Sequence, residues 1–318
     1  MATTTSITTT YAGEFAGKYI AAALLSAPTL EKGGITIHPN VKYKQVIQKV
    51  ALDDIVKNAS CDFDATSTLT LTERVLQPEE FQVNLQLCKK DFHSTWQAAE
   101  MGYSAFDQLP KSFSDYLIAY VSEKVASAME TTIWTGVNAT AGQFAGISTQ
   151  IAADAALPAA QEVTGTTVTA SNVITELGKL IDAIPARMYG QDDLTLYVSQ
   201  NIYKAYVRAL GGFASSGVGA NGYDNKGTNQ VLGDVFFDGV KVFMANGLAA
   251  NTAIATTKSN LHFATGILND MNLVKVLDMA DLDGSENVRV VMRFTADAKY
   301  GFAKIWLLTE SQTLLTNN

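Results

Sequence analysis

The sequence predicts an α+β fold, in which strands and helices occupy separate parts of the chain. Three observations lead to this class. Polar and apolar residues alternate in segments between residues 35 and 87, as they do in half-buried strands. A long amphipathic helix is predicted over residues 113–133, and a helix, a strand and a second helix follow between residues 171 and 211.

The composition limits the classes of protein to which the chain can belong. The chain has 318 residues, enough for one large or two modest domains, and 47% of them are apolar, which excludes global disorder. Only 17% are charged, against about 25% in typical soluble domains, and such a surface is compatible with packing between subunits. The net charge is −8 and no block of Lys and Arg occurs, so the pattern of a dedicated nucleic-acid binder is missing.

No membrane segment or signal peptide is predicted. The longest apolar run, residues 19–25, is too short to cross a bilayer, and the first basic residue is Lys18. We therefore expect a soluble protein made in the cytoplasm. In that compartment Cys61 and Cys88, which are the two cysteines, are expected to be reduced thiols, with a disulfide as the alternative.

Residues 1–80 predict an extended start and a ribbon. The Thr-rich opening MATTTSITTT reads as an extended arm within residues 1–36, with a disordered tail as the alternative. Alternating apolar positions then predict two strands around a polar segment, residues 51–68, that has no periodicity. The result is a long two-stranded ribbon over residues 37–80. Such a ribbon is marginal in water unless another surface covers it, either a neighbouring subunit or its own domain.

The long helix organises the chain. Six apolar residues recur every four positions on one face, and Tyr116, Tyr120 and Ala128 widen that stripe. The six are Phe113, Leu117, Val121, Val125, Met129 and Ile133. Gly136 ends the helix, which covers about residues 112–135, and Gly142 and Gly146 punctuate the segment that leaves it.

The extended β region, the long helix, the turn Trp134-Thr135-Gly136 and the later Gly146-Ile147 together resemble the major capsid proteins of tailed bacteriophages, which have the Hong Kong 97-type fold. The resemblance implies that residues 1–36 form an N-terminal arm and residues 37–80 an E-loop that lies across a neighbouring subunit. It also implies that residues 81–155 form a peripheral domain with the long helix as its spine.

The next elements resemble the axial domain of the same family, which would cover residues 156–272. A helix with Ser171 as N-cap and Pro185 beyond its end is predicted, then a strand at 194–199 and a helix over 200–211. The first helix is expected to bury one face, formed by Val173, Ile174, Leu177, Leu180, Ile181 and Ile184.

The remaining sequence predicts strands. Asp238-Gly239 marks a tight hairpin turn, and short strands are predicted at 261–269 and 272–278. The chain is expected to finish with a long antiparallel pair, residues 288–294 and 303–307, joined by a turn near Gly301. In the resembled architecture, residues 273–318 return beside the spine helix.

No catalytic, cofactor-binding or metal-binding residues are predicted. The histidines His38, His93 and His262 lie in unrelated segments without metal-ligand spacing. The segment Gly217–Gly222 matches G-x-G-x-x-G, but a helix precedes it and none follows, so a surface loop is favoured over a dinucleotide site. The acidic residues between Asp278 and Glu286 do not have the spacing of a calcium loop.

The resemblance implies a structural, non-enzymatic protein. It would assemble as hexamers and pentamers into an icosahedral head shell around double-stranded DNA, which it would not bind specifically, and it would reside in the virion without contacting a membrane. A portal and decoration proteins are implied partners. Because about 36 residues before the ribbon are too few for a built-in scaffolding domain, we expect a separate scaffolding protein and no N-terminal cleavage.

Two alternatives stay open at this point. An encapsulin-like compartment shell shares the fold and would enclose enzyme cargo instead of DNA. An α/β enzyme would use the Gly217–Gly222 loop to bind a nucleotide.

Overall fold

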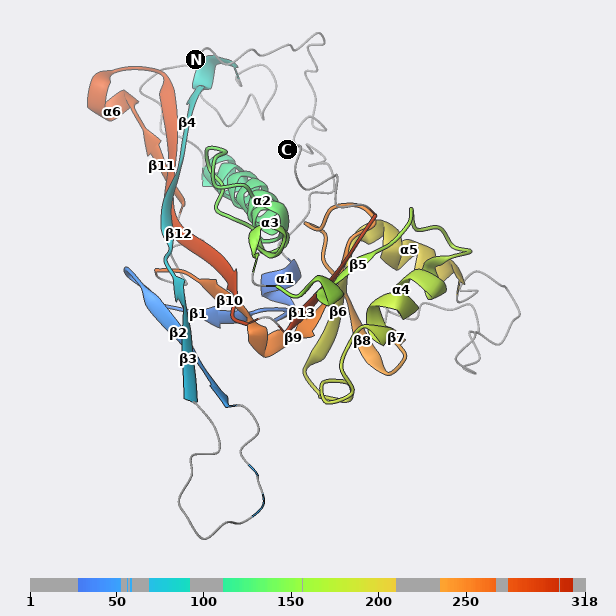
Figure 1. Ribbon diagram of the computed structural model, residues 1–318. Helices are drawn as coiled ribbons and strands as arrows, with labels where there is room; N and C mark the ends of the chain where they lie inside the picture. The colour runs from blue at the N-terminus through green and yellow to red at the C-terminus, as the bar shows by residue number, and fades with distance from the viewer. Residues whose placement is uncertain are drawn as a thin grey trace.

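The computed structural model describes residues 28–52, 56, 58, 69–91, 111–155, 157–209, 235–266, 274–302 and 304–310 (Figure 1). These residues form a five-stranded sheet, a six-stranded sheet and a separate two-stranded ribbon, with helices packed against the sheets. This arrangement confirms the predicted α+β class.

The five-stranded sheet is built around one long strand, β12. That strand pairs antiparallel with β4 over ten residue positions, and it also pairs with β10 and β11. The strand β1 adds to β10 in parallel. The bounds are β1 Thr36–His38, β4 Glu79–Cys88, β10 Leu261–Ala264, β11 Val274–Asp278 and β12 Asn287–Tyr300. The long helix α2 (Lys111–Thr135) and the short α3 (Ile147–Ala153) contact this sheet (Figure 1).

The six-stranded sheet has the order β5-β13-β9-β6-β8-β7. Its strands are β5 Glu162–Thr164, β6 Leu194–Val198, β7 Val235–Phe237, β8 Val240–Met244, β9 Ala253–Thr257 and β13 Ile305–Thr309. The helices α4 (Val173–Asp182) and α5 (Gln200–Ala209) contact each other, and α4 contacts β9 and β13. The remaining short helices are α1 Pro28–Glu31, η1 Lys89–Asp91, η2 Ala159–Gln161, η3 Lys258–Asn260 and α6 Ala280–Asp283.

Two hydrophobic cores lie on the two faces of the six-stranded sheet. Along β13, Ile305 and Leu307 join the core beneath α2, whereas Trp306 and Leu308 join the core beneath α4 and α5. Neighbouring strands divide their side chains in the same way, with Ile254 in the first core and Ala255 in the second. The six-stranded sheet therefore joins the two halves of the molecule.

The predicted final antiparallel pair is wrong. After Gly301 the chain leaves the five-stranded sheet, and β13 pairs antiparallel with β9 and parallel with β5. The physical reason is burial on both faces: the four residues from Ile305 to Leu308 are all buried. Such a strand belongs inside a covered sheet, whereas β12 alternates buried and exposed positions over much of its length.

The long helix is confirmed, and α2 spans 25 residues. Its buried face is placed differently at two positions, because Tyr120 is 37% exposed and Ala128 is also exposed. Steps of four residues advance by about 40° more than a full turn, so a stripe with that spacing drifts around the helix. Near the C-terminal end the buried face accordingly includes Glu130 and Trp134.

Glu130 is a fully buried carboxyl group that fastens the first described segment to α2. It accepts hydrogen bonds from the backbone N–H of Thr29 at 3.2 Å and from the Thr29 hydroxyl at 2.6 Å. The indole Nε1 of Trp134 donates to the same hydroxyl at 2.9 Å. Burial raises the pKa of Glu130, partly opposed by these hydrogen bonds. Residues 28–31 are thereby held against the end of the long helix.

The turn predicted at Asp238-Gly239 is confirmed. Both residues have positive φ, 45° and 77°, and they connect β7 to β8 by a two-residue loop.

Gly247 tests the close packing at the end of α2. A Cβ at this position would overlap the carbonyl oxygen of Glu130, so we expect Gly247→Ala to lower the free energy of unfolding by about 1–3 kcal/mol. Gly178 lies inside α4 and a Cβ there meets nothing within 4 Å. The control Gly178→Ala should therefore raise the free energy of unfolding by about 0.5–1 kcal/mol. Urea unfolding of unassembled chains checks both, and equal effects would contradict the packing.

Candidate assembly surface

The ribbon is formed by β2 (Gln45–Leu52) and β3 (Leu69–Leu76), which pair antiparallel along their full length. It extends away from the body of the molecule (Figure 1). Within the described ranges, no further strand pairs with either of its members. The ribbon is shorter than predicted at its start, because β1 belongs to the five-stranded sheet and the pairing of β2 begins at Gln45.

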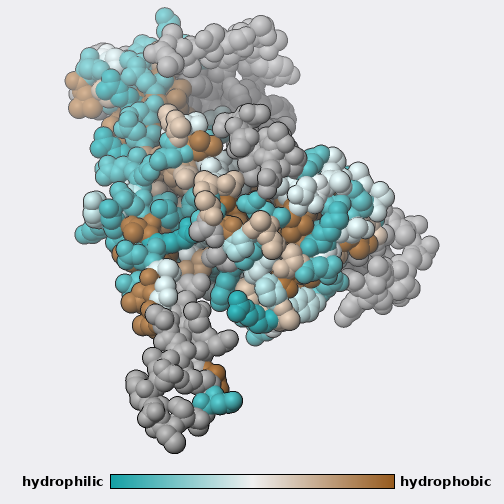
Figure 2. Space-filling model, in the orientation of Figure 1, coloured by the Kyte–Doolittle hydropathy of each residue, from teal (hydrophilic) through white to brown (hydrophobic). Residues whose placement is uncertain are grey.

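The two faces of the ribbon differ in polarity. Residues two positions apart on a strand share a face, and one face carries Val46 of β2 and Leu69, Leu71 and Val75 of β3, interrupted by the opposed pair Gln48–Glu73. We call these four apolar residues, Val46, Leu69, Leu71 and Val75, the apolar ribbon face. Val46, Leu69 and Leu71 are 47%, 55% and 65% exposed, and hydrophobic surface is visible along the ribbon in Figure 2. The opposite face carries Ile47, Thr70, Thr72 and Arg74.

The base of the ribbon is fastened to the body. Leu76, the last residue of β3, is fully buried in a small cluster with Val41 and Ala264. The ammonium of Lys299 donates to the carbonyl oxygen of Val75 at 2.8 Å, and the N–H of Gln77 donates to a carboxylate oxygen of Asp297 at 2.9 Å. Both partners lie on β12. The direction of the ribbon is therefore set by the central strand of the five-stranded sheet.

A second set of contacts holds the same joint from the side of α3. Arg74 forms an ion pair with Asp154, which follows α3, and its guanidinium lies 4.2 Å from the ring centroid of Tyr300. The Tyr300 hydroxyl donates to Asp154 as well. Burial and the neighbouring Asp154 raise the pKa of Tyr300 to about 12, so the hydroxyl stays protonated at neutral pH. One carboxylate thus binds a strand of the ribbon and a strand of the body together.

Asp297 is the buried acid of this joint and is only 5% exposed. Burial raises its pKa to about 6, while the N–H of Gln77 and the charge of Lys299 act in the opposite direction. The nearby Glu79 raises it further. Near neutral pH this group therefore titrates at the point where the ribbon meets the body.

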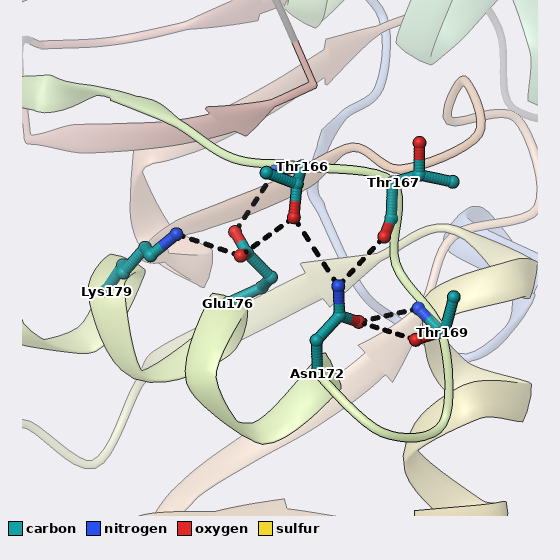
Figure 3. Close-up of polar contacts among 6 residues, drawn as sticks. All are labelled: Thr166, Thr167, Thr169, Asn172, Glu176 and Lys179. Atoms are coloured by element: carbon teal, nitrogen blue, oxygen red, sulfur yellow. Dashed lines mark hydrogen bonds and ion pairs between the residues drawn. The ribbon is translucent and has the colours of Figure 1, made fainter.

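The other prominent polar cluster lies at the start of α4 (Figure 3). Glu176 accepts hydrogen bonds from the N–H and the hydroxyl of Thr166 and from Lys179. Asn172, and not the predicted Ser171, stands at the N-cap position, and its Oδ1 accepts from the N–H of Thr169 at 2.7 Å. These contacts join a loop to a helix, which indicates a structural role. Ile174, predicted on the buried face of this helix, is 53% exposed.

The structure brings two of the three histidines together. His38 Nε2 and His262 Nδ1 lie 2.9 Å apart, because β1 and β10 are neighbours in the sheet. Two histidines from unrelated segments of the sequence therefore meet in space. His93, Cys61 and the Gly217–Gly222 loop lie outside the described residues.

Several other predicted features can be located. Cys88 is a free, half-buried thiol at the end of β4. Asp278, in the acidic segment, pairs with Lys89 at 2.5 Å. Within the described residues no group of three or more His, Cys, Asp and Glu side chains could hold a metal ion. None of the described helices is long and apolar enough to cross a membrane.

Sequence reasoning missed the carboxylates at the joint and at the helix end. Asp154, Asp297 and Glu130 are isolated in sequence from their partners, which lie 80, 220 and 101 positions away. The one available signal is an acidic residue within an otherwise apolar stretch, as at Asp297 between Ala296 and Ala298.

No protein-family profile and no curated protein sequence matches the chain. Solved structures match almost end to end. The structure described as "Capsid of native GTA particle computed with C5 symmetry" is 12% identical with a TM-score of 0.56, covering 91% of this chain and 92% of that one. This chain has the phage-capsid fold.

Two further solved structures, both from phages, match the fold of this chain. The structure from Mycobacterium phage Bobi is 16% identical with a TM-score of 0.53, covering 95% of both chains. The structure from Microbacterium phage Oxtober96 is 12% identical with a TM-score of 0.52, covering 97% of this chain and 96% of that one.

Asp297 predicts a pH effect on stability. Its folded-state pKa of about 6 lies above the ordinary value of 3.8, so the folded chain binds more protons than the unfolded chain between these pH values. Its stabilising contribution is fully present below about pH 4 and is lost as the pH rises through about 6. The thermal midpoint of the wild type minus that of Asp297→Asn should therefore increase as the pH falls from about 7.5 to about 4.5. A constant difference would contradict the raised pKa.

Proposed function

We propose that this chain is the structural major capsid protein of a tailed phage, and that many copies assemble into an icosahedral head shell around double-stranded DNA. The proposal rests on one observation. A chain that has the capsid fold over nearly its whole length also exposes an apolar face on its ribbon. The role is mechanical, and no residue is assigned to catalysis or to a cofactor.

The elements fit a Hong Kong 97-type subunit. In this assignment α2 is the spine helix and the ribbon is the main part of an E-loop at residues 37–80. Residues 1–36 are the N-terminal arm and residues 81–155 the peripheral domain. Residues 156–272 form the axial domain, and residues 273–318 return through both sheets. These sequence ranges do not coincide with the two sheets. The strand β10, at residues 261–264, belongs to the five-stranded sheet, and β13, at residues 305–309, belongs to the six-stranded sheet.

The ribbon gives the reason for assembly. A two-stranded ribbon is marginally stable alone in water, and covering apolar surface contributes about 25 cal/mol per Å². A second copy of the chain is the occupant proposed for the apolar ribbon face. In a closed symmetric shell every copy offers the same face and the same receiving surface, so each ribbon is covered.

The partners follow from this role. Copies assemble as hexamers and pentamers, together with a portal, a separate scaffolding protein and decoration proteins. The protein is made in the host cytoplasm and resides in the virion. Its net charge of −8 opposes tight contact with the packaged DNA, which is enclosed without specific binding.

Electron microscopy of the purified chain and of its source particles tests the proposal. Closed shells that protect double-stranded DNA from nuclease support it. Shells filled with enzyme would instead assign the chain to a cellular compartment. A compact monomer at all concentrations, or saturable micromolar binding of NAD or ATP measured by calorimetry, would overturn the structural role.

The apolar ribbon face predicts a matched pair of variants. Leu71 lies on that face and Thr72 lies on the opposite one, and both are exposed in the single chain. We expect Leu71→Asp to fold normally and to abolish shells, because a carboxylate would be buried without a partner between copies. Thr72→Asp should still form shells. Circular dichroism checks folding and sedimentation checks assembly, and normal shells from Leu71→Asp would refute the assigned face.

A further inference from the structure

His38 and His262 face each other on the side of the five-stranded sheet opposite the core. Their strand neighbours Ile37 and Phe263 pack into the main core, so the two histidines, which alternate with them, lie on the other side. The facing nitrogens are 2.9 Å apart, and the ring centroids are 5.1 Å apart with an angle of 50° between the ring planes. Two imidazoles from separate strands thus converge on one point.

The two rings have the chemistry of metal ligands. Burial lowers the pKa of both, so the rings are neutral at pH 7 and offer lone pairs. Among the described residues, each ring hydrogen-bonds only to the other. In each ring the second nitrogen can therefore carry the proton, so that the facing nitrogen keeps a lone pair for a metal ion.

The spacing suits two adjacent ligands of one ion. Ligand nitrogens about 2.0–2.1 Å from a metal and at a right angle lie about 2.9 Å apart. The rings must turn about their terminal torsion so that both lone pairs point at the ion, and that torsion is soft. His38 is half-buried and so reaches solvent, whereas His262 is only 8% exposed.

We propose that His38 and His262 form a two-histidine site for a divalent transition metal ion, with water completing the coordination. Ni²⁺ and Cu²⁺, which accept imidazoles at right angles, fit it best. The nearest cation in the sheet register is Lys299, whose ammonium donates to Val75 and is thereby directed toward the ribbon. A bound ion would link β1 to β10 beside the ribbon joint. This inference does not depend on the proposed function.

The test uses the full-length chain without a histidine tag, unassembled, at pH 7.5. Ni²⁺ should raise the thermal unfolding midpoint of the wild type, since it binds the folded chain in preference. EDTA should reverse the effect. In His38→Gln the second bond is lost, and we expect the affinity for Ni²⁺ to fall on the order of a hundredfold. The matched control His93→Gln removes a histidine outside the pair and should respond as the wild type does.

A spectroscopic readout separates the pair from adventitious binding. In electron paramagnetic resonance, Cu²⁺ bound to the wild type should show splitting from two equatorial nitrogens. Cu²⁺ bound to His38→Gln should show splitting from at most one nitrogen of this site. Equal midpoint shifts in the wild type and His38→Gln, or identical spectra, would overturn the proposal. Should His38→Gln fold poorly, the spectrum of the wild type alone decides, because fewer than two nitrogens excludes the site.

Discussion

The structure depends on the hydrogen-bonded pairing of β12. Its first part pairs with β4 on one side and β11 on the other, and its last part pairs with β10. Val288, Val290 and Met292 face the core beneath the long helix. Further along the same strand, Asp297, Lys299 and Tyr300 hold the ribbon. One strand therefore sets both the packing of α2 and the direction of the proposed assembly element.

The parts that sequence reasoning found are those with a local physical cause. The alternation along β12, the positive φ required at Asp238 and Gly239, and the apolar spacing of α2 are each determined within a few residues. The partner of β13 is not a local property. Its short apolar run is compatible with a strand at the edge of a sheet and with a strand covered on both faces. Only the packing of segments distant in sequence determines which of the two forms.

The candidate site divides in the same way. The apolar ribbon face follows from alternation in β2 and β3 once their register is known, but no pattern in residues 53–68 specifies that register. The joint could not be predicted, because Arg74 meets Asp154 from another element and Asp297 meets the backbone of Gln77. Likewise, His38 and His262 are 224 positions apart and become neighbours only through the pairing of β1 with β10.

A ribbon fixed at its base and uncovered along its length suits assembly better than a free hairpin does. Ordering a residue's backbone costs about 1–2 kcal/mol, and association must offset whatever ordering it causes. Leu76, Arg74 and Lys299 set the direction of the ribbon within the single chain. Less freedom then remains to be lost when a second copy arrives, so more of the hydrophobic gain at the apolar ribbon face appears as binding. In the proposed shell, Asp154 and Asp297 would therefore favour assembly by ordering the ribbon in advance.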